Sequence, residues 1–208
     1  VGDAGVGKTR LTREFLDSVS QHARVLRGRC LPYGDGITFW PVAEVVRQAA
    51  DIREEDPPEA ARRRLSALLG PGTDDIVDRV ATAIGLQAAP FQIAELFWGI
   101  RRFLEVLGQD EPVVVLFDDI HWAESTFLDL VGHLVDATSD APLLVLCTSR
   151  HELLDERPDW AEREHEARTV LSPLTEADSE AVIDNLLGRA GLAADARAAI
   201  VAAAEGNP

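Results

Sequence analysis

The sequence predicts an α/β fold in three layers, with helices on both faces of a parallel β-sheet. Two apolar runs, PVVVLF and APLLVLC, are continuous, as strands buried on both faces of a parallel sheet are. Between them, apolar residues recur at helical spacing over about 125–137, which predicts an amphipathic helix. A strand, a helix and a second strand in this order form a right-handed crossover unit, so we expect both runs in one sheet.

The composition is that of a globular protein with a strongly acidic balance. The 208 residues are 46% hydrophobic and 27% charged, enough for one sizeable core. With 36 acidic and 20 basic residues, the net charge of −16 argues against direct binding to nucleic acid or to an anionic membrane. Cys30 and Cys147 belong to no metal-binding or redox motif, and the apolar runs are too short to span a bilayer. We therefore expect a cytoplasmic protein with buried, reduced thiols.

The first nine residues, VGDAGVGKT, fit the phosphate-loop pattern G-x-x-x-x-G-K-[ST], with Gly2, Gly7, Lys8 and Thr9 in register. Glycines let successive backbone N–H groups point at phosphate oxygens, and the helix that begins near Thr9 adds the positive end of its dipole. Lys8 would reach the β- and γ-phosphates, and the Thr9 hydroxyl would ligate magnesium. The alternative is a glycine-rich turn before a surface helix.

The position of this loop bears on the extent of the chain. A phosphate loop follows a buried strand, but only Val1 precedes the first glycine. We therefore expect that the first strand is missing from this sequence. Because the chain stops at EGNP without a finished domain, we also expect it to be a piece of a longer protein.

The rest of the chain predicts further elements in order. A helix is expected over about 10–19 and a strand over 24–30. Turn signals then separate four helices, expected at about 40–51, 58–69, 74–85 and 91–107. These four helices form a helical insertion, about 40–108, in a phosphate-loop core that we place at 1–172. Trp40 and Trp98 are expected to be packing residues of this insertion.

The C-terminal part predicts one more strand and two helices. ARTVLSP, at about 167–172, is expected to be a strand. Beyond Pro173, Thr175 and Asp178 are placed like a capping box before a helix, and a second helix at about 194–204 closes on Gly206. We interpret residues 173–208 as the start of a truncated helical lid.

Polar residues follow the two buried runs where each predicted strand ends. PVVVLF leads into Asp118 and Asp119, and APLLVLC leads into a polar run that includes Arg150. Ligands of open parallel sheets gather at this edge, so Asp118 is a natural magnesium partner of Thr9. Asp119 would orient or deprotonate the attacking water, and Arg150 could sense the γ-phosphate. The alternatives are an ordinary acidic loop and a surface arginine.

The segments GDAGVGKTRL, VVVLFDDIHWAE, LLVLCTSR and EGNP, in this order, resemble the signal-transduction ATPases with numerous domains. These proteins are a branch of the AAA+ type phosphate-loop fold. GRCLPYGDGITFWPVAEVVRQA, together with DDIHWAESTFLDLV, is similar to the ATPase modules of large bacterial regulators. Some of these carry a class III adenylate or guanylate cyclase domain on the N-terminal side, and others a LuxR-type DNA-binding domain at the C-terminus.

The resemblance implies ATP and Mg²⁺ as ligands and a role for each matching residue. Residues 2–9 match the Walker A loop, and Asp118 matches the Walker B acid that holds the metal with Thr9. Asp119 stands where many relatives have a catalytic glutamate, so we expect slow hydrolysis by Asp119 with Lys8 and Arg150. His121 and Trp122 match a family signature for which we have no mechanism beyond packing. The residues expected to bind nucleotide are Gly2, Ala4, Gly5, Val6, Gly7, Lys8, Thr9, Arg10 and Pro208, the last by packing on the adenine.

The function that this pattern favours is a nucleotide-dependent switch. ATP would hold the sheet and the segment after Pro173 together, and ADP would hold them differently. A cyclase, DNA-binding or repeat domain outside this sequence would make the output, and the switch could form a nucleotide-dependent oligomer. The alternatives are a remodelling or loading AAA+ ATPase with steady turnover, a small-molecule kinase, and a scaffold that binds no nucleotide.

Overall fold

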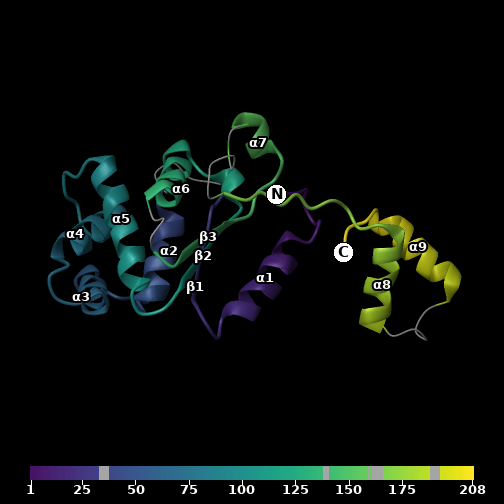
Figure 1. Ribbon diagram of the computed structural model, residues 1–208, viewed down its shortest axis with the longest axis horizontal. Coiled ribbons are helices and arrows are strands. Elements are labelled where there is room, and N and C mark those ends of the chain that lie inside the picture. Colours follow the sequence, from purple (N-terminus) through teal and green to yellow (C-terminus); the bar gives the residue numbers. More distant parts are fainter. Residues whose placement is uncertain (33–37, 138–140, 159, 161–165, 188–192) are drawn as a thin grey trace. The chain divides into compact units, whose positions relative to one another are not determined.

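The computed structural model of the chain describes residues 1–32, 38–137, 141–158, 160, 166–187 and 193–208 (Figure 1). These residues form two compact units. One unit consists of Val1–Phe15 and Arg150–Pro208, and the other of Leu16–Ser149. No helix among the described residues combines the length and the apolar character that crossing a bilayer requires.

The larger unit is built on a parallel sheet of three strands in the order β1-β2-β3. The strands are β1 (Arg24–Arg29), β2 (Val113–Asp118) and β3 (Leu143–Cys147). In this register Arg29 lies opposite Asp118, and Phe117 lies opposite Cys147. The first five residues of β2 are buried, because this central strand has neighbours on both sides and helices on both faces. The predicted parallel sheet is confirmed for both apolar runs.

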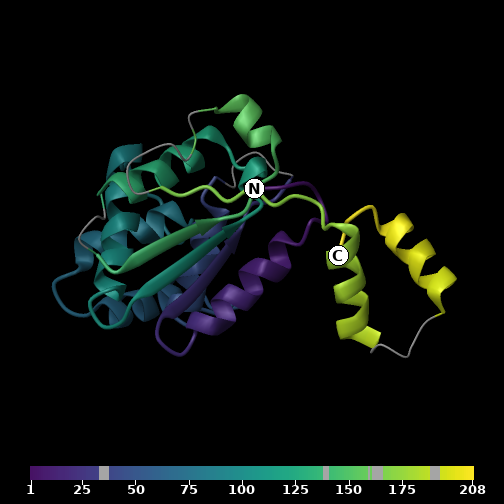
Figure 2. The same ribbon diagram turned by 45° about the vertical axis from the view of Figure 1, so that its right-hand side comes forward.

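Helices cover the two faces of this sheet (Figure 2). On one face, Leu16 in the C-terminal half of α1 (Lys8–Val19) packs against Val114 and Leu116 of β2. On the other face, the ring of Phe117 meets that of Phe127 in α6 (Ser125–Ala137) edge to face, with 5.0 Å between centroids. Alternate residues of β2 therefore serve opposite layers, and the three-layer prediction is confirmed for this unit.

The four helices predicted between about 40 and 107 are confirmed, with small shifts at their ends, and their role as an insertion in the core stays a prediction. They are α2 (Trp40–Ala49), α3 (Pro58–Leu69), α4 (Asp74–Ala83) and α5 (Ile93–Leu107). Helix α2 ends before Asp51 and α4 before Gly85, since these residues have φ of 50° and 77° and cannot continue a helix. Helix α5 begins two residues late because Gln92 and Glu95 form a capping box.

Helices α4 and α5 pack around the side chain of Arg79. Its guanidinium lies over the rings of Phe91 and Trp98, at 4.7 and 5.2 Å from their centroids, and pairs with Glu95 at 3.1 Å. A Cβ on Gly99 would lie 2.5 Å from that of Arg79, so the glycine permits the close approach. Trp98 is a packing residue, as predicted.

The smaller unit contains the phosphate loop, α7 (Glu152–Glu156), α8 (Glu176–Leu187) and α9 (Ala194–Ala204). The predicted capping box precedes α8: the Asp178 N–H donates to Thr175 Oγ1 at 3.2 Å, and the Thr175 hydroxyl donates back to the Asp178 carboxylate at 2.6 Å. Helix α9 closes, as predicted, on Gly206, whose φ is 78°.

The prediction of a strand at about 167–172 was wrong for the described residues. Val1 donates its amino group to Thr169 O, and Leu171 donates its N–H to Val1 O, both at 2.8 Å. This is the bond pattern of a single parallel bridge opposite Val170. A strand needs several successive pairs, and Val1 supplies one, so 166–175 run without regular structure. The predicted core boundary at residue 172 stays a prediction.

Candidate functional site

The phosphate loop adopts a backbone that only glycine accepts readily. Gly5 and Gly7 have φ of 82° and 99°, in the left-handed region, and Lys8 begins α1 directly afterwards. The first helical hydrogen bond runs from Leu11 N–H to Gly7 O at 2.9 Å. Helix α1 carries no acidic residue in its first turn. Its N-terminus therefore presents main-chain N–H groups and the positive end of the helix dipole with no acidic side chain in the first turn, which suits an anion.

The ammonium of Lys8 is folded back over this loop. Its Nζ donates to the carbonyl oxygens of Gly2 at 2.6 Å and of Asp3 at 2.8 Å. These neutral acceptors fix the cation beside the loop without neutralising its charge. The residue therefore keeps its Coulomb attraction for a phosphate group.

The C-terminal residues Asn207 and Pro208 lie against the same loop. A Cβ on Gly5 would come within 2.4 Å of the Asn207 amide, and one on Gly7 within 3.3 Å of Pro208 Cγ. Gly5 is therefore needed for this contact as well as for the backbone conformation, whereas a side chain at position 7 would only crowd Pro208. The structure brings Pro208 to the phosphate loop, and its packing on an adenine stays a prediction.

In the larger unit, Thr148 bonds the carboxylate of Asp118 and the main chain of Asp119 at the end of β2. Its hydroxyl donates to Asp118 Oδ1 and accepts the main-chain N–H of Asp119 at 3.0 Å. Thr148 is 3% exposed, and Asp119 is held in the left-handed region with φ of 58°. An aspartate tolerates this conformation better than a bulky residue does. Sequence analysis gave Thr148 no role, although a hydroxyl at the end of the neighbouring strand was the available signal.

Arg29, at the end of β1, pairs with Asp119. Its Nη2 and Nε lie 2.9 and 3.2 Å from the same oxygen, Asp119 Oδ2. The hydrogen bond and the charge of Asp119 raise the pKa of Arg29. The Arg29 side chain is 63% exposed and that of Asp119 is 23% exposed, so solvent screens the pair. Sequence analysis missed Arg29 because the contact depends on the pairing of two strands far apart in the chain.

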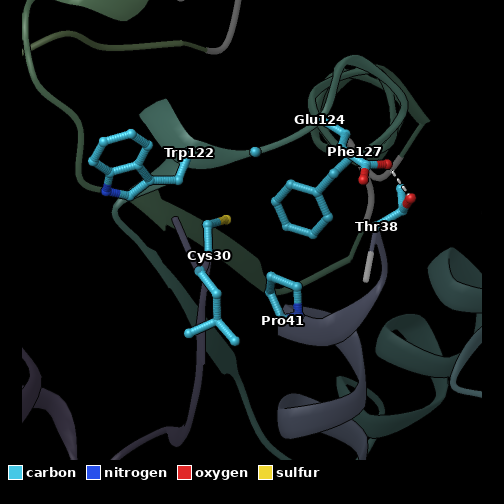
Figure 3. Close-up of a pocket in the computed structure, with 8 residues that line it drawn as sticks. Cys30, Thr38, Pro41, Trp122, Glu124 and Phe127 are labelled. Atoms are coloured by element: carbon cyan, nitrogen blue, oxygen red, sulfur yellow. Dashed lines mark hydrogen bonds between the residues drawn. The ribbon is translucent and has the colours of Figure 1, made fainter. Parts of the chain in front are cut away.

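A shallow pocket lies beside these strand ends, between Cys30 and the segment after β2 (Figure 3). The Thr38 hydroxyl donates to Glu124 at its rim, and the exposed indole of Trp122 forms another wall. With a volume of about 30 Å³ it has room for about one water molecule and none for a nucleotide. Burial, with the nearby acids, raises the pKa of the Cys30 thiol to about 12, so this thiol is unreactive. Cys30 is buried, as predicted, whereas Cys147 is only half-buried, and neither forms a disulfide.

The structure brings the predicted site residues together as two groups. The phosphate-loop group, with Lys8 and Pro208, belongs to the smaller unit, and the carboxylate group around Asp118 and Asp119 belongs to the larger one. Arg150 is the residue at which the second segment of the smaller unit begins. That the two groups meet around one nucleotide stays a prediction.

The available metal ligands suit a hard cation bound with phosphate. Among the described residues, no group of three or more His, Cys, Asp or Glu side chains could hold a metal ion. Mg²⁺ needs no such cluster, because it takes one or two protein oxygens and completes its shell with phosphate and water. The hydroxyl of Thr9 and the carboxylate of Asp118 are oxygen donors of this kind.

A parallel sheet flanked by helices, a glycine-rich loop at a helix N-terminus and paired acids at a strand end define a nucleotide-binding α/β domain. Residues 1–146 match the family described as AAA ATPase domain, and the chain belongs to this family. Its members are ATPases, which use ATP and typically Mg²⁺. The match includes the phosphate loop, the insertion and both carboxylates.

The chain also resembles a longer protein, the uncharacterized protein R02095 of Rhizobium meliloti (strain 1021). The two are 29% identical over 193 residues, which cover 88% of this chain. The matched part is 18% of the length of that relative.

Proposed function

We propose that this chain is the ATP-binding, slowly hydrolysing switch module of a multidomain regulator. The observation that carries the proposal is the phosphate loop, with left-handed Gly5 and Gly7 and the Lys8 ammonium beside it, in a chain of the AAA ATPase family. In this proposal the output comes from a cyclase, DNA-binding or repeat domain elsewhere in the protein. Cytoplasmic localisation and a nucleotide-dependent oligomer belong to the same proposal.

The residues divide the chemistry between them. Lys8 and the loop N–H groups would bind the phosphates, and the Thr9 hydroxyl and the Asp118 carboxylate would hold Mg²⁺, which would offset negative charge on the phosphates. Water attacks the γ-phosphorus, and the bond to the β–γ bridging oxygen breaks. ADP leaves with that oxygen, and inorganic phosphate is the other product. Asp119 takes the proton of the attacking water and releases it to solvent.

Two features of Asp119 support slow turnover. An aspartate reaches one methylene less far than the glutamate found at this position in many relatives. Its Oδ2 is also engaged by Arg29, so this oxygen must be released before it can accept a proton from water. A group that is occupied in the resting state lowers the fraction of molecules that are ready to react.

The contacts of Asn207 and Pro208 support a switch rather than simple hydrolysis. They join the phosphate loop to the end of α9, through Gly5 and Gly7. The loop must adjust when phosphates enter and leave. These contacts can therefore transmit a change of bound nucleotide to the positions of α8 and α9. Turnover above about 1 s⁻¹ would instead favour the remodelling ATPase.

An ATP titration of the full chain with Mg²⁺ tests the proposal. Lys8→Ala should abolish binding, because it removes the cation that meets the β- and γ-phosphates. Arg13→Ala removes one positive charge from the exposed face of the same helix and is the matched control. Unchanged affinity in Lys8→Ala, or an equal loss in Arg13→Ala, would overturn the proposal.

A further inference from the structure

We propose that helix α2 of the insertion controls when Asp119 can act, with Glu44 as the positioning residue. In this view Glu44 fixes the end of β1, and Arg29 at that end restrains the carboxylate. The inference rests on the proposed function, since it assigns a restraint to the same hydrolytic site.

The first step is the attachment of α2 to the outer edge of β1. The side-chain amide of Gln48 accepts the main-chain N–H of Arg27 at 3.0 Å and donates to the carbonyl of the same residue. Two residues further along this edge, the main-chain N–H of Arg29 donates to Glu44 Oε2 at 2.6 Å. Glu44 and Gln48 are four residues apart and share one face of α2. Two side chains thus take the place of a neighbouring strand.

The second step is that α2 and β1 can hardly move relative to each other. A Cβ on Gly28, between the two clamped residues, would lie 2.2 Å from the carbonyl oxygen of Pro41 in α2. The backbone of β1 therefore lies directly against the helix at this point. A shift of α2 must move the end of β1 with it, because no compressible layer of side chains separates them.

The third step connects β1 to the carboxylates. The side chain of Arg29 reaches Asp119 Oδ2, and the main-chain N–H of Cys30 donates to Asp118 O at 2.9 Å. Glu44 thus fixes the backbone of the same residue whose guanidinium restrains Asp119. The exposed Arg29–Asp119 pair is weak enough to open during a catalytic cycle. A ligand or domain that moves the insertion would release Asp119 by this route.

Steady-state ATP hydrolysis by the full chain, at saturating ATP and Mg²⁺, tests the inference. Arg29→Ala should raise kcat about 3- to 10-fold, and Glu44→Ala should raise it by a smaller factor, both with an unchanged Kd for ATP. Glu44→Gln keeps an acceptor oxygen for the Arg29 N–H and should stay near the wild type. Glu59→Ala, an exposed change in α3, is the control for loss of a negative charge in the insertion.

A gain in rate is informative because damage to the fold would lower kcat rather than raise it. Salt gives a second readout: 0.5 M KCl should raise the kcat of the wild type relative to that of Arg29→Ala, because it screens a pair that the variant lacks. A kcat that is unchanged or lower in Arg29→Ala, at normal affinity and circular dichroism, would overturn the inference. Absence of hydrolysis in both the wild type and Arg29→Ala would also overturn it. These outcomes leave the Lys8-dependent binding of the proposed function intact, so the two failures are distinguishable.

Discussion

Gly28 of β1 and Pro41 of α2 are in direct main-chain contact, with 2.2 Å between a Cβ built on the glycine and the proline carbonyl oxygen. Real Cβ contacts are never so short, so Gly28→Ala must push α2 away from the strand. We expect a loss of about 1–3 kcal/mol in the free energy of unfolding, as for an overpacked core. Urea denaturation measures it.

The control for this prediction is Gly108→Ala. Gly108 has an ordinary helical φ of −69°, and the nearest atom to its Cβ lies at 3.4 Å. The free energy of unfolding of this variant should stay within about 0.5 kcal/mol of that of the wild type. Equal stability of Gly28→Ala and Gly108→Ala would show that α2 does not lie on β1 as described.

Thr148→Val should destabilise the chain although it conserves shape. The hydroxyl both donates to Asp118 and accepts from the Asp119 N–H, and the valine leaves both half-buried groups without this partner. We expect a loss of about 1–3 kcal/mol in urea denaturation. Thr148→Ser keeps the hydroxyl and should retain most of the free energy of unfolding that the valine variant loses. A serine variant as unstable as the valine variant would show that the methyl group of Thr148, and not its hydroxyl, is responsible.

Asp119→Asn should keep ATP binding and cut hydrolysis by a factor on the order of 10²–10⁴, the usual size of a general-base effect. Asparagine also accepts the left-handed backbone that Asp119 adopts, so the fold should not change. Single-turnover hydrolysis and an ATP titration measure the two properties separately. Normal turnover in this variant would show that another group takes the proton.

Stability should fall as the pH drops below about 6.5, partly because of His133. Burial, and then the charge of Arg101, lower the pKa of this residue from 6.5 in the folded chain. The unfolded chain therefore binds the proton first, which favours unfolding at pH values below the unfolded pKa. The ring lies 5.8 Å from Phe97, between α5 and α6, with Glu105 and Asp136 as the nearby acids.

Urea denaturation between pH 7.5 and 5.5 checks this expectation. His133→Gln should flatten the pH dependence of the unfolding free energy. His22→Gln, which changes an exposed histidine, should leave the wild-type slope. A slope that is the same in all three chains would rule out a contribution from His133.

Elements with a strong local pattern could be predicted from the sequence. In the continuous apolar run of β2 and the helical spacing of α6, the apolar residues themselves indicate which positions face the core. Both elements were found where expected. The four helices of the insertion were predicted for the same reason. The strand at 167–172 failed because a strand depends on the extent of its partner, and its pairing here is with Val1 alone among the bonds described.

The same distinction holds for the candidate site. The phosphate loop is a contiguous motif, so its glycines and Lys8 could be identified from their spacing. The contact of Arg29 with Asp119 spans ninety positions in the sequence and requires the register of β1 on β2. The role of Thr148 likewise depends on β3 lying beside β2. Such contacts follow from tertiary pairing and leave no periodic signal.

The amide of Gln48 and the carboxylate of Glu44 also block the addition of a further strand to the sheet at the edge of β1. They occupy main-chain groups of Arg27 and Arg29 that an incoming chain would need for β-augmentation. An added strand would first have to displace α2. Recruitment of another polypeptide by sheet extension, or uncontrolled fibre formation, is therefore disfavoured along β1.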